Sequence, residues 1–286
     1  MPYETPPALR TALEDRLKNQ ARATGVDLQR LRRSAVFERL LVRLDAASPG
    51  KWILKGGMAI EFRLGHRARA TRDLDLALRG NVDEADEARD LLTESLTTDP
   101  DDDRFEFAVG EPTPLQGDEA GLAGWRFSVD ASLAGRRFAT VRVDVVARRD
   151  EIVGTERIRL PGTMTFAGMP TRDVEIVDRR QHFAEKLHAL TRTYGERPSS
   201  RVRDLPDLVL LIEDGLDPDS ELLSRVQYLF DVRGTHPVPD HIPEPPSDWT
   251  QRYATLASEL DIAATSLDAA MCLLRDFWER ASQTPT

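Results

Sequence analysis

KWILKGGMAIEFRLGHRARATRDLDLALR, residues 51–79, is the stretch that decides the fold. Residues 51–54 predict a short strand that runs into the glycine pair Gly56-Gly57, and residues 58–64 predict a short helix. Glycines between a strand and a helix let backbone N–H groups approach a phosphate closely, and Lys55 can add a positive charge there. Without further evidence, a lone glycine pair is a plain tight turn.

The end of the same stretch predicts a second strand, Asp73 to Leu78, in which acidic and apolar residues alternate. Because successive side chains of a strand point to opposite faces, Asp73 and Asp75 share one face while Leu74 and Leu76 point into the core. Two carboxylates about 7 Å apart along one strand can converge on a divalent cation. Neither can be buried alone, so each needs a metal, an arginine or water.

A third acid lies in a later strand, Ala139 to Ala147, whose valines alternate with more polar residues. Asp144 occupies the polar face in the middle of this strand, where solubility explains it poorly. If this strand lies beside Asp73 and Asp75, the three carboxylates can hold two Mg²⁺ ions. Such a site can align a hydroxyl with a phosphate and stabilise the leaving group.

The remaining pattern predicts an α+β protein with two lobes: residues 1–165 with a mixed, largely antiparallel sheet flanked by helices, and residues 166–286 with a helical C-terminal domain. The boundary is expected near residues 160–172, where the character of the sequence changes. Further strands are predicted at 104–109, 124–131 and 137–147, the last two forming a hairpin through Leu133-Ala134-Gly135, and helices at 7–24, 27–44, 84–97, 178–194, 204–214, 218–231 and 249–283, the last broken near 262–266.

Composition restricts the class of protein. The chain has 286 residues, a net charge of −10 and one cysteine, Cys272, which excludes an internal disulfide. Neither a signal peptide nor a membrane span is evident, so a cytoplasmic location without membrane contact is expected. The negative charge argues against a protein that coats nucleic acid without specificity.

The charges are unevenly distributed. Arginines gather at Arg30, Arg32, Arg33, Arg39 and Arg43, whereas acids gather at Asp99–Asp103. The arginine cluster permits a basic groove on an acidic protein, although the ordinary alternative is a solvated helix face.

Four motifs occur in order: Lys55-Gly56-Gly57-Met58-Ala59 with Arg63, Thr71-Arg72-Asp73-Leu74-Asp75, Glu185-Lys186-Leu187-His188, and Arg203-Asp204-Leu205-Pro206-Asp207-Leu208. Together they resemble the nucleotidyltransferase signature of the DNA polymerase β superfamily. More narrowly, they resemble the AbiEii/MenT family of nucleotidyltransferase toxins. The resemblance implies a polymerase-β-type nucleotidyltransferase domain that transfers a nucleotide from an NTP, with Mg²⁺, to the 3′ end of tRNA. It also implies a toxin–antitoxin system with a cognate antitoxin as partner.

The resemblance also implies roles for residues. Asp73, Asp75 and Asp144 would be metal ligands, Asp144 activating the acceptor hydroxyl, and Lys186 and Asp207 would complete the catalytic set. Nucleotide phosphates would be held by Lys55, Gly56, Gly57, Thr71, Arg72 and Lys186.

Several of these residues have ordinary alternatives. Lys186 can be a surface lysine that only extends its amine to water. Asp204 can be a helix N-cap, with Pro206 tolerated in the first turn. Thr71, at a position whose hydroxyl is phosphorylated by the antitoxin in some relatives, can be an ordinary residue at a strand entry. The histidines at 66, 182 and 188 lack partners at useful spacing and are interpreted as structural or surface residues.

Two other functions fit the sequence. The first is a nucleotidyltransferase that modifies a small molecule or a protein hydroxyl, which would need no basic track. The second is an inactive nucleotidyltransferase fold used as a binding module, against which the intact Asp73, Asp75 and Asp144 argue. A polyanionic acceptor would use the arginine cluster at residues 30–43 and bind with steep salt dependence.

Overall fold

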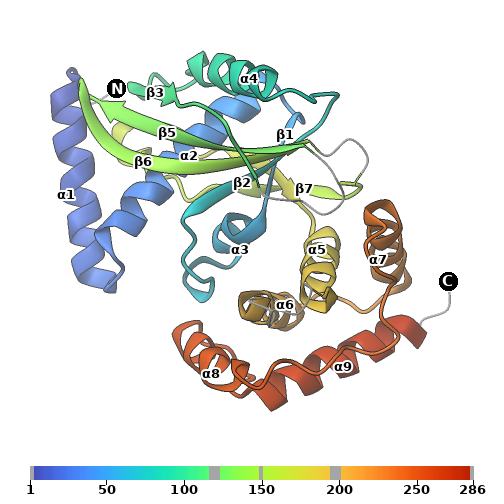
Figure 1. The fold of residues 1–286 in the computed structure, drawn as a ribbon. Coiled ribbons are helices and arrows are strands. Elements are labelled where there is room, and N and C mark those ends of the chain that lie inside the picture. The colour runs from blue at the N-terminus through green and yellow to red at the C-terminus, as the bar shows by residue number, and fades with distance from the viewer. Residues whose placement is uncertain (1–2, 116–122, 148–150, 194–200, 284–286) are drawn as a thin grey trace.

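The strands form one mixed sheet. A computed structural model describes residues 3–115, 123–147, 151–193 and 201–283 (Figure 1), with the side chain of His66 outside the described part. Within it, eight strands are ordered β3-β5-β6-β2-β1-β8-β7, and the short β4 pairs with β5. The strands are β1 Trp52–Lys55, β2 Asp73–Leu78, β3 Phe105–Val109, β4 Thr113–Pro114, β5 Gly124–Leu133, β6 Arg136–Ala147, β7 Thr155–Arg159 and β8 Asp173–Val177.

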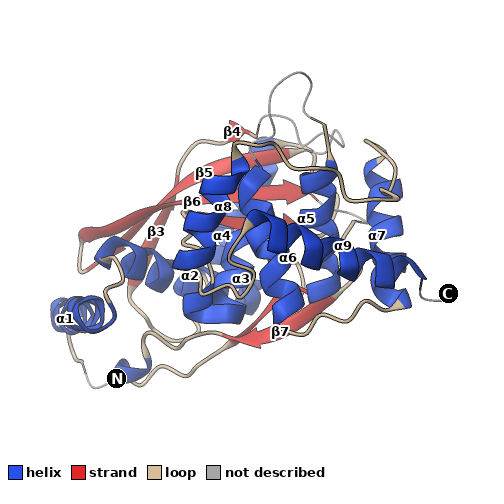
Figure 2. Cartoon of the chain, turned by 90° about the horizontal axis from the view of Figure 1, so that it is seen from below, coloured by secondary structure: helices blue, strands red, loops and turns tan. Residues whose placement is uncertain are grey.

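Helices flank this sheet and make up the C-terminal part of the chain. They are α1 Pro6–Thr24, α2 Leu28–Ala47, α3 Gly56–Leu64, α4 Ala85–Thr97, α5 Arg179–Thr191, α6 Asp204–Glu213, α7 Ser220–Arg233, α8 Trp249–Glu259 and α9 Leu267–Gln283. Helices α5 to α9 gather on the side of the sheet that carries α3 (Figures 1 and 2). In the described part of the chain, no helix has the length and apolar character needed to cross a membrane.

Local sequence explains where several elements begin and end. The side chain of Thr5 accepts a hydrogen bond from Ala8 N at the start of α1, and Gly25 ends this helix in the left-handed conformation. The side chain of Asp27 accepts a hydrogen bond from Arg30 N and caps the start of α2. The β5–β6 turn places Ala134 and Gly135 at φ 56° and 66°, as expected of a tight hairpin, so the predicted hairpin is confirmed.

The sheet extends further along the chain than the sequence indicates. The pattern did not predict β7 or β8, yet β8 pairs in parallel with β1 inside the sheet, and β7 pairs with β8. Because β8 is Asp173–Val177, the sheet continues past residue 165, where the N-terminal domain was expected to end. The α+β class itself is confirmed, with a mixed sheet flanked by helices and a helical C-terminal part.

Buried side chains form two large cores. One runs from Leu9 to Ile176 and joins the sheet to α1, α2 and α4, whereas the other runs from Phe183 to Ala281 within the C-terminal helices. The line between the cores lies near the start of α5. Most of the predicted site residues lie on either side of this line. They belong to α3, the ends of β1 and β2, α5 and α6.

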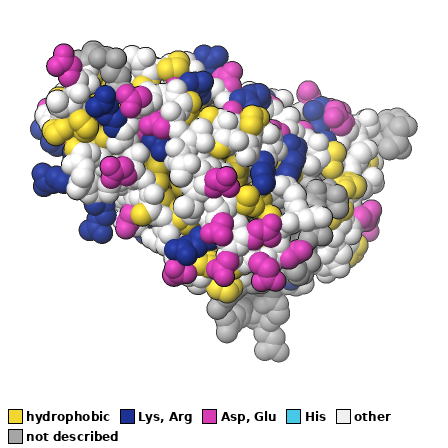
Figure 3. All heavy atoms as spheres, turned by 90° about the horizontal axis from the view of Figure 1, so that it is seen from above, with side chains coloured by type: hydrophobic (Ala, Val, Ile, Leu, Met, Phe, Trp, Pro, Cys, Tyr) yellow, Lys and Arg dark blue, Asp and Glu magenta, His cyan; other side chains and the backbone are white. Residues whose placement is uncertain are grey.

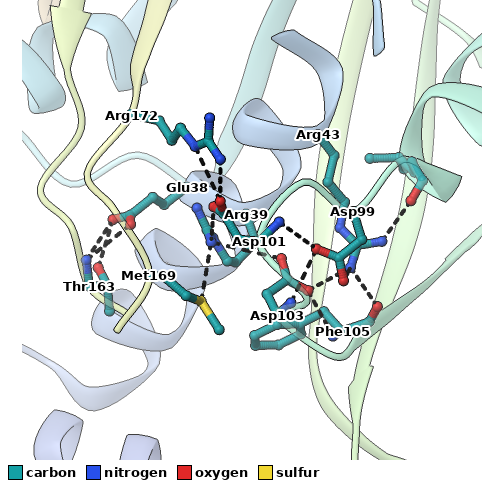
Figure 4. A network of polar contacts seen from close by, with 11 residues as sticks. Glu38, Arg39, Arg43, Asp99, Asp101, Asp103, Phe105, Thr163, Met169 and Arg172 are labelled. Atoms are coloured by element: carbon teal, nitrogen blue, oxygen red, sulfur yellow. Dashed lines mark hydrogen bonds and ion pairs between the residues drawn. The ribbon is translucent and has the colours of Figure 1, made fainter. Parts of the chain in front are cut away.

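The clustered charges at Arg39, Arg43 and Asp99–Asp103 form a buried network (Figure 4). Arg43 Nη2 lies 2.5 Å from Asp103 Oδ1, and Arg39 Nη1 lies 3.1 Å from Asp101 Oδ2. These four side chains are at most 5% exposed, so the interpretation as solvated faces is wrong for them. Burial raises the pKa of Asp103, although Arg43 opposes the shift.

The network joins α2 to two loops. Arg43 also donates to the carbonyls of Leu96 and Phe105, at 2.8 and 2.9 Å, and therefore fixes the loop before β3. Glu38, one residue before Arg39, accepts from the backbone and hydroxyl of Thr163 in the loop between β7 and β8. These arginines stabilise the fold, so they are unavailable as an open basic groove.

Candidate active site

Four charged residues form a row across the sheet. Arg126 on β5 is the register partner of Asp144 on β6, Asp144 is the partner of Asp75 on β2, and Asp75 is the partner of Lys55 on β1. Adjacent strands lie about 4.8 Å apart, so the row spans roughly 14 Å. The predicted neighbourhood of Asp144 and the Asp73/Asp75 strand is therefore confirmed, with the two acids in the middle and a cation at each end.

The glycine turn lies directly against Asp75. Gly56 has a φ of 65°, and a Cβ on it would lie 2.0 Å from Asp75 Oδ2. Among the described residues no hydrogen bond or ion pair engages the Asp75 carboxylate. Removal from water raises the pKa of Asp75 to about 6; Asp144 and Asp73 add to this shift, whereas Lys55 and Lys186 oppose it.

The other two acids are held by arginines. Arg126 binds Asp144 with two hydrogen bonds, Nε to Oδ1 at 2.8 Å and Nη2 to Oδ2 at 2.7 Å, and its Nη2 lies 4.0 Å from Asp73. Arg142 Nε lies 2.6 Å from Asp73 Oδ1, in an ion pair that lacks hydrogen-bond alignment. The hydrogen bonds with Asp144 raise the pKa of Arg126 above its ordinary value.

The donor set suits a hard divalent cation, because it offers carboxylate oxygens from three aspartates on neighbouring strands. Burial is the main cause of the raised pKa of Asp75 and repulsion by Asp144 and Asp73 adds to it, and such a cation would relieve both. In the described ranges no three His, Cys, Asp or Glu side chains already converge as a metal site. In this structure the carboxylates of Asp144 and Asp73 are engaged by the guanidinium groups of Arg126 and Arg142 instead.

Gly57 faces the Thr71 side of the site. A Cβ on Gly57 would lie 3.2 Å from both Thr71 Oγ1 and Arg69 Nη2. Thr71 is buried, and its hydroxyl donates to the carbonyl of Asp73 at 3.4 Å. Arg72, also predicted to hold phosphates, is exposed. Gly57 thus faces the buried hydroxyl of Thr71 and the guanidinium of Arg69.

The C-terminal motifs meet in a buried ionic cluster. Lys186 Nζ lies 2.8 Å from Asp204 Oδ1 and 2.7 Å from Asp207 Oδ2, and Arg69 Nε lies 3.2 Å from Asp207 Oδ1. Burial alone would lower the pKa of Lys186, but Asp204 and Asp207 raise it. Burial alone would raise the pKa of Asp207, but Lys186 and Arg69 lower it. Lys186 and Asp207 therefore both stay charged at neutral pH.

Two ordinary alternatives for these residues are wrong. Lys186 is only 9% exposed, so it is not a surface lysine. Asp204 is the first residue of α6, whose N-cap is Arg203, and its carboxylate accepts a hydrogen bond from Lys186. Pro206 lies in the first turn of α6, as expected.

Lys55 also contacts the C-terminal helices. Its Nζ lies 3.3 Å from Glu185 Oε2 on α5, so the residue before the glycine pair links the sheet to the helical part. Glu185 belonged to a quoted motif but had no predicted role, and Arg69 lies outside the quoted motifs. Arg126 was missed, although alternation within β5 puts it on the polar face, opposite buried Trp125 and Phe127.

The fold and these motifs define a nucleotidyltransferase, and comparison with known families agrees. The model of the family described as nucleotidyl transferase AbiEii toxin, type IV toxin–antitoxin system, matches residues 39–279. The chain therefore belongs to the AbiEii family of nucleotidyltransferase toxins, and membership in a type IV system implies an antitoxin partner.

Solved structures are more distant. The chain is 17% identical to JHP933 from Helicobacter pylori, with 90% of this chain and 89% of that chain covered and a TM-score of 0.41. It is 16% identical to an antigenic nucleotidyltransferase-like protein from Paracoccidioides brasiliensis, with 79% and 93% covered and a TM-score of 0.41. None of the curated proteins compared with the chain matches it. The family assignment thus rests on the family model.

Proposed function

We propose that this chain transfers a nucleoside monophosphate from an NTP to an RNA acceptor in the cytoplasm, with the 3′ end of tRNA as the acceptor. One observation carries the proposal: Asp75 and Asp144 are register partners on neighbouring strands, and Gly56 lies against the Asp75 carboxylate. A phosphate-binding turn and an acidic centre in direct contact are what nucleotidyl transfer requires.

The roles follow from position. Asp73, Asp75 and Asp144 would hold two Mg²⁺ ions, which supply charge neutralisation for the triphosphate and the leaving pyrophosphate. The backbone N–H groups of Gly56 and Gly57 start α3 and face the anion, with help from the helix N-terminus. Asp144 accepts the proton of the attacking hydroxyl.

Five further side chains serve the nucleotide. Lys55, Thr71 and Arg72 lie in the turn and at the start of β2, where they contact the phosphates. Lys186 stands between Asp204 and Asp207, which keep it charged and fix its direction. It neutralises the triphosphate from the helical side, and Asp207 positions it.

The test is transfer of label from each of the four α-labelled NTPs to total tRNA in the presence of Mg²⁺. We expect one or more NTPs to label tRNA, and Asp75→Asn to reduce the rate by a factor on the order of 10²–10³, because a charge at the reaction centre is lost. Asp130→Asn is the matched control, since Asp130 is an exposed acid on β5 outside the row. Failure of the pure protein to label tRNA with any NTP would contradict the proposal.

A second candidate is transfer to a small molecule or a protein hydroxyl. It is favoured by the state of the arginines expected to form an RNA track. Arg39 and Arg43 are buried, Arg30 lies 2.9 Å from Glu61, and Arg32 lies 2.5 Å from Glu14. Basic and acidic side chains also alternate among the described residues on the face in Figure 3. Labelling of a small acceptor or a protein, with weak and salt-insensitive tRNA binding, would identify this function. An inactive binding module would fail to bind Mg²⁺-NTP at all.

A further inference from the structure

Two arginines lie on the polar face of the sheet beside the three acids. Arg126 comes from β5 and Arg142 from β6, and their side chains are 39% and 46% exposed. Their partners Asp144 and Asp73 are much less exposed, at 11% and 29%. The guanidinium groups therefore cover the carboxylates from the solvent side, where a substrate has to approach.

The two ends of the row Lys55–Asp75–Asp144–Arg126 differ in how well they suit each of the two substrates. At the β1 end, Lys55 is 13% exposed, engaged by Glu185, and followed by the Gly56-Gly57 turn. At the β5 end, Arg126 is accessible, with 39% of its side chain exposed. If the triphosphate occupies the glycine end, its reacting phosphorus lies over Asp75 and Asp144, and the second substrate has to enter from the Arg126 end.

The chemistry of Arg126 suits a phosphate. It now holds Asp144 through two parallel hydrogen bonds, and this forked geometry matches a phosphate group as well as a carboxylate. The guanidinium side of this ion pair is 39% exposed, so a phosphate can reach Arg126 from the solvent. The arginines at positions 30, 32, 39 and 43 are each paired with an acid, so they do not form the expected basic track.

We propose that Arg126, with Arg142 beside it, binds a backbone phosphate of the acceptor strand next to its reactive hydroxyl. This inference rests on the proposed transfer to RNA. Arg126 is a positioning residue: it releases Asp144 to the reaction centre and takes a phosphate in its place. The β5–β6 hairpin then sets the direction from which the RNA end enters, opposite the glycine turn.

The test compares Arg126→Ala with Arg136→Ala, in fluorescence anisotropy of a labelled tRNA transcript with Mg²⁺ at several salt concentrations. Arg136 is an exposed arginine at the other end of β6, about 27 Å from Asp144 along the strand. For Arg126→Ala we expect affinity to fall on the order of ten-fold and the slope of log affinity against log salt to decrease by about 0.7–0.9. Arg136→Ala should match the wild type, and Arg126→Lys should recover part of the affinity.

Steady-state kinetics separate this role from a structural one. Arg126→Ala should raise KM for tRNA by about the same ten-fold and leave KM for the NTP within about two-fold. A transcript shortened at its 3′ end should bind wild type and Arg126→Ala equally. Thermal unfolding of each variant checks that the fold is retained.

Three results would overturn the inference. A higher KM for the NTP with unchanged tRNA affinity would assign Arg126 to the nucleotide instead. If the wild type labels tRNA and Arg126→Ala has the same tRNA affinity and kinetics, Arg126 is only a partner of Asp144. The proposed function would then still stand. A wild type that neither binds nor labels tRNA would refute the proposed function and this inference together.

Discussion

Replacement of Gly56 by alanine tests the contact at the centre of the site. The added Cβ would lie 2.0 Å from Asp75 Oδ2 and 2.7 Å from Asp75 Cγ, so the carboxylate has to retreat by more than about 1 Å to reach van der Waals separation. A shift of about 1 Å at a reacting centre can cost on the order of 100-fold in rate. The positive φ of 65° adds about 1–2 kcal/mol of backbone strain, which lowers the free energy of unfolding.

Gly25→Ala separates strain from displacement. Gly25 has a φ of 71°, and a Cβ there meets nothing within 4 Å, so this variant carries the backbone strain without the clash. We expect Gly25→Ala to lose about 1–2 kcal/mol in urea unfolding and Gly56→Ala to lose at least as much, and only Gly56→Ala to lose about 100-fold in label transfer from NTP to tRNA. Transfer by Gly56→Ala within a few-fold of wild type, or an equal loss in Gly25→Ala, would refute the reasoning.

Three further predictions concern buried charge. Asp207→Ala leaves Lys186 short of one buried partner and should lower the free energy of unfolding by about 3 kcal/mol in urea titrations; a neutral effect would mean that water reaches the cluster. Arg43→Met removes the nearest cation from the buried Asp103 carboxylate and should lower the free energy of unfolding by about 3–5 kcal/mol while tRNA affinity stays unchanged; lost affinity at unchanged stability would make Arg43 a binding residue. Burial, aided by Lys186, lowers the pKa of His182 to about 3, so below about pH 6.5 the unfolded chain binds a proton that the folded chain does not. Stability should therefore fall by about 1.4 kcal/mol per pH unit below pH 6.5, and His182→Gln should remove this component; equal pH slopes in both proteins would contradict it.

Part of the site followed from local sequence alone. Strand alternation put Asp73 and Asp75 on one face and Asp144 on the polar face of its strand, and all three lie there. The glycine pair between a strand and a helix was equally visible. These features depend on neighbours within a few residues, so a pattern of period two or 3.6 is sufficient to find them.

Other elements could not be predicted from the sequence, because their partners in the fold are distant in sequence. The strand β8 has only five residues, and its neighbour in the sheet, β1, lies more than a hundred positions earlier. A short strand with two acids shows little pattern of its own, and its parallel pairing with β1 makes it a strand of the central sheet. Its place in the sheet moved the N-terminal core beyond residue 165.

The sequence by itself determined that this chain carries a glycine turn, three strand acids and a helical lysine in the order of a nucleotidyltransferase, because each is written in local periodicity and motif. Only the tertiary structure decided what these groups touch. It put Asp144 beside Asp75 with Arg126 on its other side, and it buried Arg43 against Asp103, sixty residues away. Coulomb attraction and burial act through space, so two arginines that look alike in sequence take different roles. Arg43 holds the fold together, whereas Arg126 is a candidate contact for the substrate.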